Sequence, residues 1–137
     1  MSSLIIPRTI FDRIISHCVS VYPDEACGIL AGEKDTVRKI YEMTNSEPSP
    51  VSYFMDPKEQ FLAMKEMRRR GLHMMAVYHS HPSSPPYPSA KDVSLASYPD
   101  SLYIIVGLSD KDRPEVHAYT IVEGKVSEAE MEVLPGS

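Results

Sequence analysis

A chain of 137 residues, 42% of them hydrophobic, is long enough to bury a core as one domain. Its formal net charge of −5 argues against nucleic-acid binding, because such proteins use a broad basic face to displace counterions from phosphate. We expect a cytoplasmic protein without membrane contact. The chain has only two cysteines (Cys18 and Cys27), it does not begin with the charged segment of a signal peptide, and it has no apolar run long enough to span a bilayer.

Strands and one helix alternate in the first part of the chain. Residues 4–6 are predicted to form a short strand, and residues 8–21 a helix with one apolar stripe of hydrophobic residues at i+4 spacing. After a break at 22–24, strands are predicted at Glu25–Gly32 and Thr36–Met43. The two strands are expected to pair through the turn between them.

The second part of the chain begins with a strong helix start. Asp56 is the expected N-cap and Pro57 the first residue of a helix that runs to Arg70. The remaining predicted elements are a central strand at His73–His81, a short helix at Ser89–Tyr98, a buried strand at Ser101–Leu108 and a closing hairpin of Val116–Val122 and Lys125–Val133. This order predicts one α/β domain over residues 1–137, with a mixed sheet flanked by helices.

Two histidines at the end of the predicted central strand are candidate metal ligands. In an extended chain, residues two apart point to the same face, so His79 and His81 project together. Pro82 then ends the strand, which fits a site at the mouth of a sheet. A pattern this short also occurs by chance on strands that bind nothing.

Ser89 and Asp92 have two interpretations. Ser-x-x-Asp before a helix is typical of a capping box, in which the two residues satisfy the first backbone N–H groups. The same helix start would hold Asp92 at a fixed position, where its carboxylate could join two imidazoles as the third ligand of a catalytic zinc. The two roles do not exclude each other.

The motif His79-Ser80-His81-Pro82 followed by Ser89 and Asp92 resembles the signature of the JAMM (MPN+) zinc metallopeptidases. The segment around Glu25, Pro23 to Gly32, is similar to the acidic segment upstream of that signature. The resemblance covers nearly the whole chain and implies an MPN domain, which is cytidine-deaminase-like in fold, with a largely antiparallel mixed sheet.

The resemblance also implies a role for each matched residue. His79, His81 and Asp92 would bind one zinc ion per chain, Glu25 would act as general base and then general acid, and Ser89 would donate a hydrogen bond to the oxyanion. Without the resemblance, Glu25 is interpreted as a surface carboxylate after a turn. Ser80, on the opposite strand face, and Cys27 are expected to be structural.

The substrate follows from the resemblance alone. Members of the family cut the amide bond after the Gly-Gly tail of ubiquitin-like proteins, and such a tail would add as a strand to an exposed sheet edge. The chain is similar to bacterial members that release cysteine from a ubiquitin-like sulfur-carrier protein. The alternatives are a broader isopeptidase or processing protease for ubiquitin-like proteins and a non-catalytic MPN scaffold. A zinc deaminase is excluded, because its His-x-Glu and Cys-x-x-Cys motifs are missing.

Overall fold

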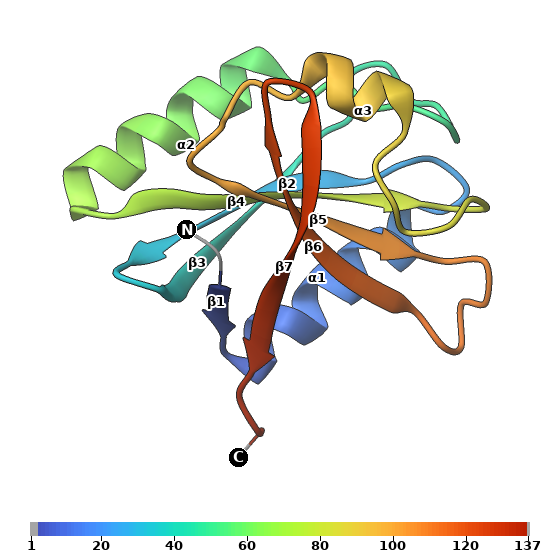
Figure 1. Ribbon diagram of the computed structural model, residues 1–137. Coiled ribbons are helices and arrows are strands. Elements are labelled where there is room, and N and C mark those ends of the chain that lie inside the picture. Colours follow the sequence, from blue (N-terminus) through green and yellow to red (C-terminus); the bar gives the residue numbers. More distant parts are fainter. Residues whose placement is uncertain (1–2, 137) are drawn as a thin grey trace.

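Seven strands close into a barrel in the computed structural model, which describes residues 3–136 (Figure 1). They follow the order β1–β3–β2–β4–β5–β6–β7 around the barrel. Their bounds are Ser3–Ile6 for β1, Cys27–Glu33 for β2, Thr36–Met43 for β3, His73–His81 for β4, Leu102–Gly107 for β5, Glu115–Val122 for β6 and Lys125–Val133 for β7. The predicted mixed, largely antiparallel sheet is confirmed. Four pairs are antiparallel (β2/β3, β2/β4, β5/β6 and β6/β7), and three are parallel (β1/β3, β1/β7 and β4/β5).

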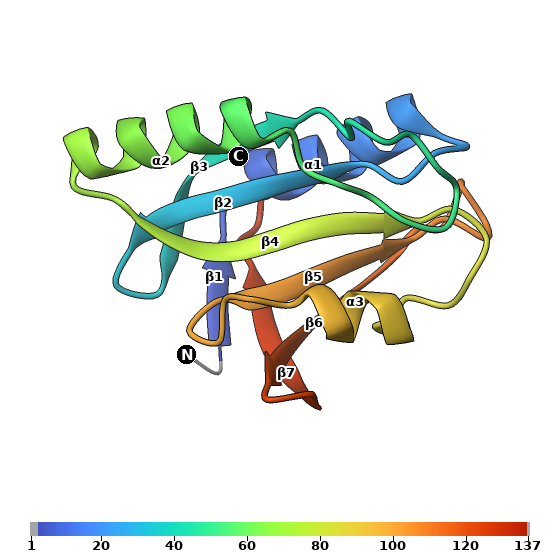
Figure 2. The same ribbon diagram turned by 90° about the horizontal axis from the view of Figure 1, so that it is seen from above.

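Three helices pack on this barrel: α1 (Arg8–Val21), α2 (Pro57–Arg70) and α3 (Ala90–Leu95). Figure 1 shows α2 and α3 above the crossing strands and α1 below them, and in Figure 2 β4 runs between α2 and α3. The predicted start of α2 is confirmed, since the Asp56 carboxylate accepts hydrogen bonds from the backbone N–H groups of Lys58 and Glu59. Gly71, with φ of 71°, ends that helix.

Alternation along β4 divides the core into two clusters. Ala76 and Tyr78 pack with residues of α1, including Ile14 and Cys18. Val77 points to the other face and packs with residues of α2, including Met67. Because β4 is covered on both faces, its side chains are held rigidly up to its last residue, His81, which is buried.

The strand β4 lies in the middle of the sheet, between β2 and β5. It pairs antiparallel with β2 and parallel with β5, with His79 opposite both Cys27 and Ile105. The strand that carries the histidines therefore has no free edge to which a substrate tail could add. The parallel β4/β5 pair instead requires a crossover, and this crossover contains α3 and returns the chain over the end of β4.

Two predicted boundaries differ from the structure by more than one residue. Glu25 precedes β2 instead of lying in it, because its backbone N–H donates to the Ser49 carbonyl of the loop before α2. The third helix ends at Leu95 and not at 98, because the backbone N–H groups of Ser97 and Tyr98 donate to the Tyr103 hydroxyl. In both places a tertiary hydrogen bond replaces a local one.

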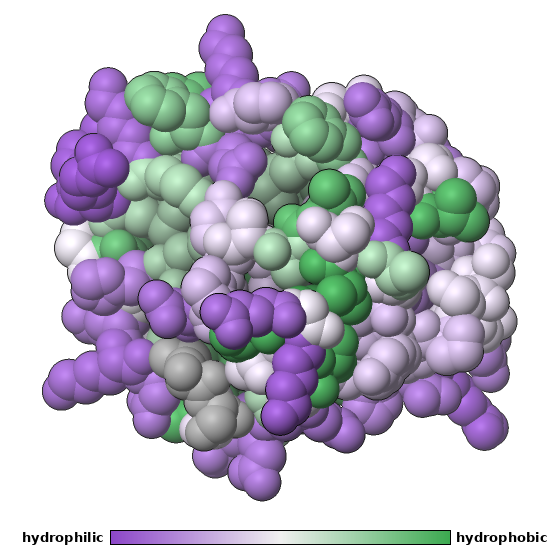
Figure 3. Space-filling model, turned by 45° about the horizontal axis from the view of Figure 1, so that its top comes forward, coloured by the Kyte–Doolittle hydropathy of each residue, from purple (hydrophilic) through white to green (hydrophobic). Residues whose placement is uncertain are grey.

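The surface around α2, α3 and the β6–β7 hairpin is a mosaic of apolar and hydrophilic residues (Figure 3). Exposed large apolar side chains include Phe54, Phe61, Leu62 and Leu95. No helix among residues 3–136 combines the length and apolar character needed to cross a membrane.

Candidate metal centre

The structure brings His79, His81 and Asp92 together at the end of β4. The His79 Nε2 and His81 Nε2 atoms are 3.1 Å apart, and each lies 3.1 Å from Asp92 Oδ2. Three donor atoms in one tetrahedral zinc shell, with bonds of about 2.0–2.1 Å, would be separated by about 3.3 Å. The triangle therefore has the size and the donor chemistry of a site for a divalent metal ion.

The ring of His81 is oriented by a second hydrogen bond. Its Nδ1 donates to the Pro85 carbonyl at 2.7 Å, so the protonated nitrogen is Nδ1 and the lone pair of Nε2 faces Asp92. Metal-binding histidines in proteins are commonly held in this way by a backbone carbonyl. The loop between β4 and α3 thus leaves the Nε2 lone pair of His81 facing the cluster.

The ring of His79 is held by packing. Tyr53 stacks on it with a centroid distance of 4.7 Å and an interplanar angle of 30°. Burial lowers the pKa of His79, which keeps the imidazole neutral, the form that binds metals. The sequence did not indicate Tyr53, because the loop that carries it has no motif and only the fold places it against β4.

Asp92 serves the helix cap and the cluster at once. Its Oδ2 accepts a hydrogen bond from the Ser89 backbone N–H at 2.9 Å, while its own N–H donates to Ser89 Oγ at 3.0 Å. Burial alone would raise the pKa of Asp92, but the hydrogen bonds with His79 and His81 outweigh burial and hold that pKa well below its usual range. The capping box is confirmed, and its acidic member also faces both histidines.

Glu25 is a buried carboxylate beside this cluster. Only 3% of the residue is exposed, and its Oε1 has no hydrogen-bond partner among the described residues. Burial, aided by the negative charge of Asp92, raises the pKa of Glu25 to about 8, although the charges of His81 and Lys91 oppose the shift. The interpretation as an ordinary surface carboxylate is therefore wrong.

Ser80 connects the strand of the histidines to the residue after Glu25. The Ala26 backbone N–H donates to Ser80 Oγ at 2.8 Å, and the Ser80 N–H donates to the Ala26 carbonyl at 3.2 Å. Both residues are buried, so the expectation of a structural role is confirmed. Cys27 is fully buried in the cluster under α2, where burial raises the pKa of its thiol to about 12, so it packs as expected.

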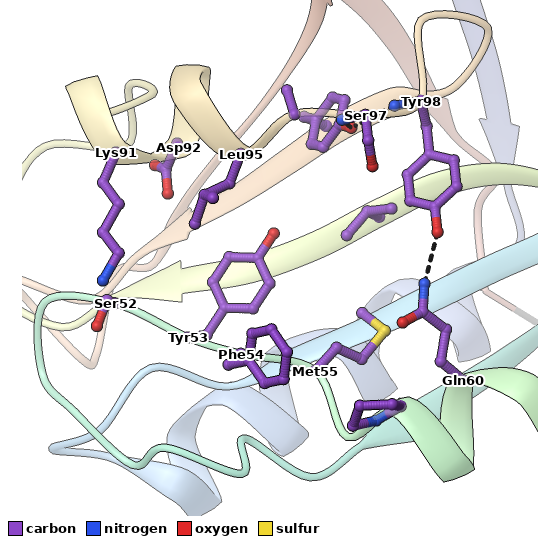
Figure 4. Close-up of a pocket in the computed structure, with 14 residues that line it drawn as sticks. Ser52, Tyr53, Phe54, Met55, Gln60, Lys91, Asp92, Leu95, Ser97 and Tyr98 are labelled. Atoms are coloured by element: carbon purple, nitrogen blue, oxygen red, sulfur yellow. Dashed lines mark hydrogen bonds between the residues drawn. The ribbon is translucent and has the colours of Figure 1, made fainter.

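A cavity of about 350 Å³ opens beside Asp92 (Figure 4). Its walls come from the loop before α2 and from α3 with the segment that follows it, and they include Tyr53, Phe54, Leu95 and Tyr98. A hydrogen bond from Gln60 to the Tyr98 hydroxyl joins the two walls at the far end. Aromatic and aliphatic side chains dominate the lining, so the cavity suits an extended apolar segment of a ligand.

Known proteins are similar to this chain over most of its length. The chain is 37% identical to the CysO-cysteine peptidase of Mycobacterium tuberculosis, covering 96% of this chain and 91% of that protein. It is 32% identical to a probable TtuB-protein conjugate cleaving protease of Thermus thermophilus, covering 89% and 78%. A solution structure of a protein from Desulfitobacterium hafniense matches with a TM-score of 0.87 and 33% identity over 96% of this chain and 92% of that one.

The family model for prokaryotic homologs of the JAB domain matches residues 7–122. The matched range contains both histidines of the triangle, the capping box with Asp92, and Glu25. The relatives match nearly the whole chain, and their names are those of peptidases. The chain belongs to the family of prokaryotic homologs of the JAB domain.

Proposed function

We propose that this chain is a zinc metallopeptidase that hydrolyses the amide bond after the Gly-Gly tail of a ubiquitin-like sulfur-carrier protein and releases cysteine. The observation that carries the proposal is the triangle of His79, His81 and Asp92, with all three edges at 3.1 Å. The choice of substrate is supported by the mycobacterial relative, which is named a CysO-cysteine peptidase. A cytoplasmic location is part of the proposal and suits the two free cysteines.

The three triangle residues would hold one zinc ion, and the open fourth position is typical of catalytic sites. When bound, zinc would acidify water and polarise the scissile carbonyl. Glu25 would accept the proton of the attacking water and return it to the leaving amine. Its burial supports this role, because a pKa near 8 lets one carboxyl group both accept and donate a proton near neutral pH.

Ser89 would stabilise the oxyanion of the tetrahedral intermediate. Its Oγ accepts a hydrogen bond from the Asp92 N–H, which leaves the hydroxyl proton free to be donated. The loss of one such donor costs about 2.7–4 kcal/mol of barrier in other hydrolases. The capping box supports this role because it fixes the hydroxyl beside Asp92.

The cavity beside Asp92 would hold the carrier's tail. A Gly-Gly terminus is thin and extended, and the residues before it could contact Phe54 and Leu95 on the two walls. The tail would lie beside β4 without pairing with it, since β4 is paired on both sides.

A second candidate is a broader protease that cleaves proteins conjugated to ubiquitin-like carriers. The similarity to the TtuB-protein conjugate cleaving protease favours it, at 32% identity over most of both chains. The two candidates share the reaction and differ in the leaving group, which is a free amino acid in the first and a protein amine in the second.

The proposal is tested by incubating the zinc-loaded chain with CysO extended by one C-terminal cysteine and following the carrier by mass spectrometry. We expect the mass of one cysteine to be lost. The Glu25→Gln variant should retain its zinc by metal analysis, but its activity should fall about 10²–10⁴-fold, which is the usual contribution of a general acid–base. Glu130→Gln, on the exposed side of β7, is the matched control and should be as active as the unaltered chain. Hydrolysis by Glu25→Gln at the full rate contradicts the role of Glu25.

A further inference from the structure

Lys91 is a cation beside the metal centre that has no role in the mechanism above. It directly precedes Asp92 on α3 and is exposed. Among residues 3–136, no carboxylate oxygen lies within ion-pairing distance of its ammonium group, although the chain is acidic overall. In Figure 4 its side chain extends from α3 across the gap toward Ser52, on the loop before α2.

The loop around Ser52 is fastened to the backbone of Glu25. The side-chain Nδ2 of Asn45 donates to the Glu25 carbonyl at 3.0 Å and to the Ser52 carbonyl at 3.1 Å. Lys91 therefore reaches the side of the metal centre on which Glu25 lies. Its positive charge acts on the Glu25 carboxyl group, in the direction that lowers the pKa of that group.

The cavity has Ser52 and Lys91 at one end and extends from there past Asp92. Figure 4 shows Leu95 and then Tyr98 with Gln60 leading away from Lys91. If the carrier's tail occupies the part of the cavity between Leu95 and Tyr98, the leaving group lies at the other end, on the side of Lys91 and Glu25. This agrees with the chemistry, since the leaving amine takes its proton from Glu25 when the carbon–nitrogen bond breaks and the hydroxyl of water stays on the carbonyl carbon.

We propose that Lys91 binds the α-carboxylate of the amino acid that the enzyme releases. This inference rests on the proposed function and specifies its leaving group. In a C-terminal amino acid the carboxylate is separated from the scissile nitrogen by the α-carbon alone, so it must lie beside Glu25. An anion placed there, next to Glu25 and Asp92, needs a cation, and Lys91 supplies one without breaking an existing ion pair.

The same lysine disfavours the alternative leaving group. When a protein lysine side chain leaves, its amine is attached to an uncharged methylene chain, and no carboxylate lies next to the scissile bond. Lys91 then gains no partner. The residue therefore selects for a free C-terminal amino acid over an isopeptide.

The experiment compares two carriers with the zinc-loaded full-length chain: CysO extended by cysteine and CysO extended by cysteinamide, which has the same thiol and amide bond but a neutral end. We expect kcat/KM to be about tenfold higher for the cysteine form, as a charge-assisted hydrogen bond typically provides. Lys91→Met should remove this preference, Lys91→Arg should retain most of it, and Lys65→Met, on the exposed face of α2, should leave it unchanged. Zinc content is measured for each variant.

Two results overturn the inference, and they are distinguishable. Equal kcat/KM for the two carriers, with the same ratio in Lys91→Met, contradicts the role of Lys91 while leaving the peptidase proposal intact. Hydrolysis of neither carrier by the zinc-loaded chain contradicts the proposed function, and the inference falls with it.

Discussion

Glu25 combines burial with an unsatisfied oxygen, a combination that is costly to a folded protein. The residue is 3% exposed, and its Oε1 has no partner among the described residues. Stability would favour an apolar side chain or a paired one at this position. The proposed catalytic role favours the carboxyl group, because its raised pKa is what a group that transfers a proton near neutral pH needs.

Glu25→Gln should therefore stabilise the metal-free protein in a pH-dependent way. The pKa of Glu25 is about 8 in the fold and about 4.5 in the unfolded chain, so the unfolded state loses its proton first and the stability falls as pH rises from 4.5 to 8. Glutamine mimics the protonated form and avoids this loss. We expect the free energy of unfolding of the variant to exceed that of the unaltered chain by a few kcal/mol at pH 8.

The measurement is urea unfolding of both proteins in chelator at pH 4.5 and pH 8. The difference should be small at pH 4.5, where the carboxyl group is protonated in the fold and about half protonated in the unfolded chain. A difference that does not depend on pH would show that Glu25 is not the titrating group.

At the scale of elements, the residues of the candidate site come from segments that meet at one end of the barrel. β4 contributes His79 and His81, the crossover to β5 contributes Asp92, and the stretch before β2 contributes Glu25. The regular pairing of β2 with β4 ends at Cys27 and His79. Beyond that pair, two hydrogen bonds between Ser80 and Ala26 continue to hold the two segments together.

Ser80→Ala should weaken this connection. The substitution leaves the buried Ala26 N–H without its acceptor, which costs about 1–3 kcal/mol of stability. Because Glu25 adjoins Ala26, we also expect kcat to fall more than the zinc affinity. Thermal unfolding and steady-state kinetics measure the two effects, with Ser127→Ala on the exposed face of β7 as the control. If Ser80→Ala leaves kcat unaltered, the loop before α2 is sufficient to position Glu25.

At the scale of the whole molecule, the barrel does not depend on the metal centre for its core. The two apolar clusters occupy both faces of the central strands, and neither includes a residue of the His79–His81–Asp92 triangle. Burial of these clusters supplies the main driving force for folding. We therefore expect the fold to persist when no metal ion is bound.

Chelation should therefore abolish hydrolysis without unfolding the protein. We expect an unchanged far-ultraviolet circular dichroism spectrum in excess chelator and a lower Tm, since free metal at about 100 times its Kd contributes roughly 2.7 kcal/mol. Added zinc should restore both the activity and the Tm. Loss of the spectrum on chelation would instead mean that the metal is part of the structural core.

Local chemistry was sufficient to predict most elements. Asp56 and Pro57 predict the start of α2 because capping involves only neighbouring residues, and the two-residue period of a strand places His79 and His81 on one face. The capping box likewise predicts the position of Ser89 and Asp92. Capping and strand alternation involve only a few neighbouring residues, so both can be recognised in the sequence.

The tertiary structure decided which of these residues meet. Glu25 is separated from His79 by two strands and a helix, and its burial follows from the Ser49, Asn45 and Ser80 contacts, which have no sequence pattern. The sequence by itself determined the family signature, the strand of the histidines and the capped helix, because each depends on local spacing. The closed barrel alone decided the 3.1 Å triangle, the raised pKa of Glu25 and the direction of Lys91, because burial and proximity are properties of the folded chain.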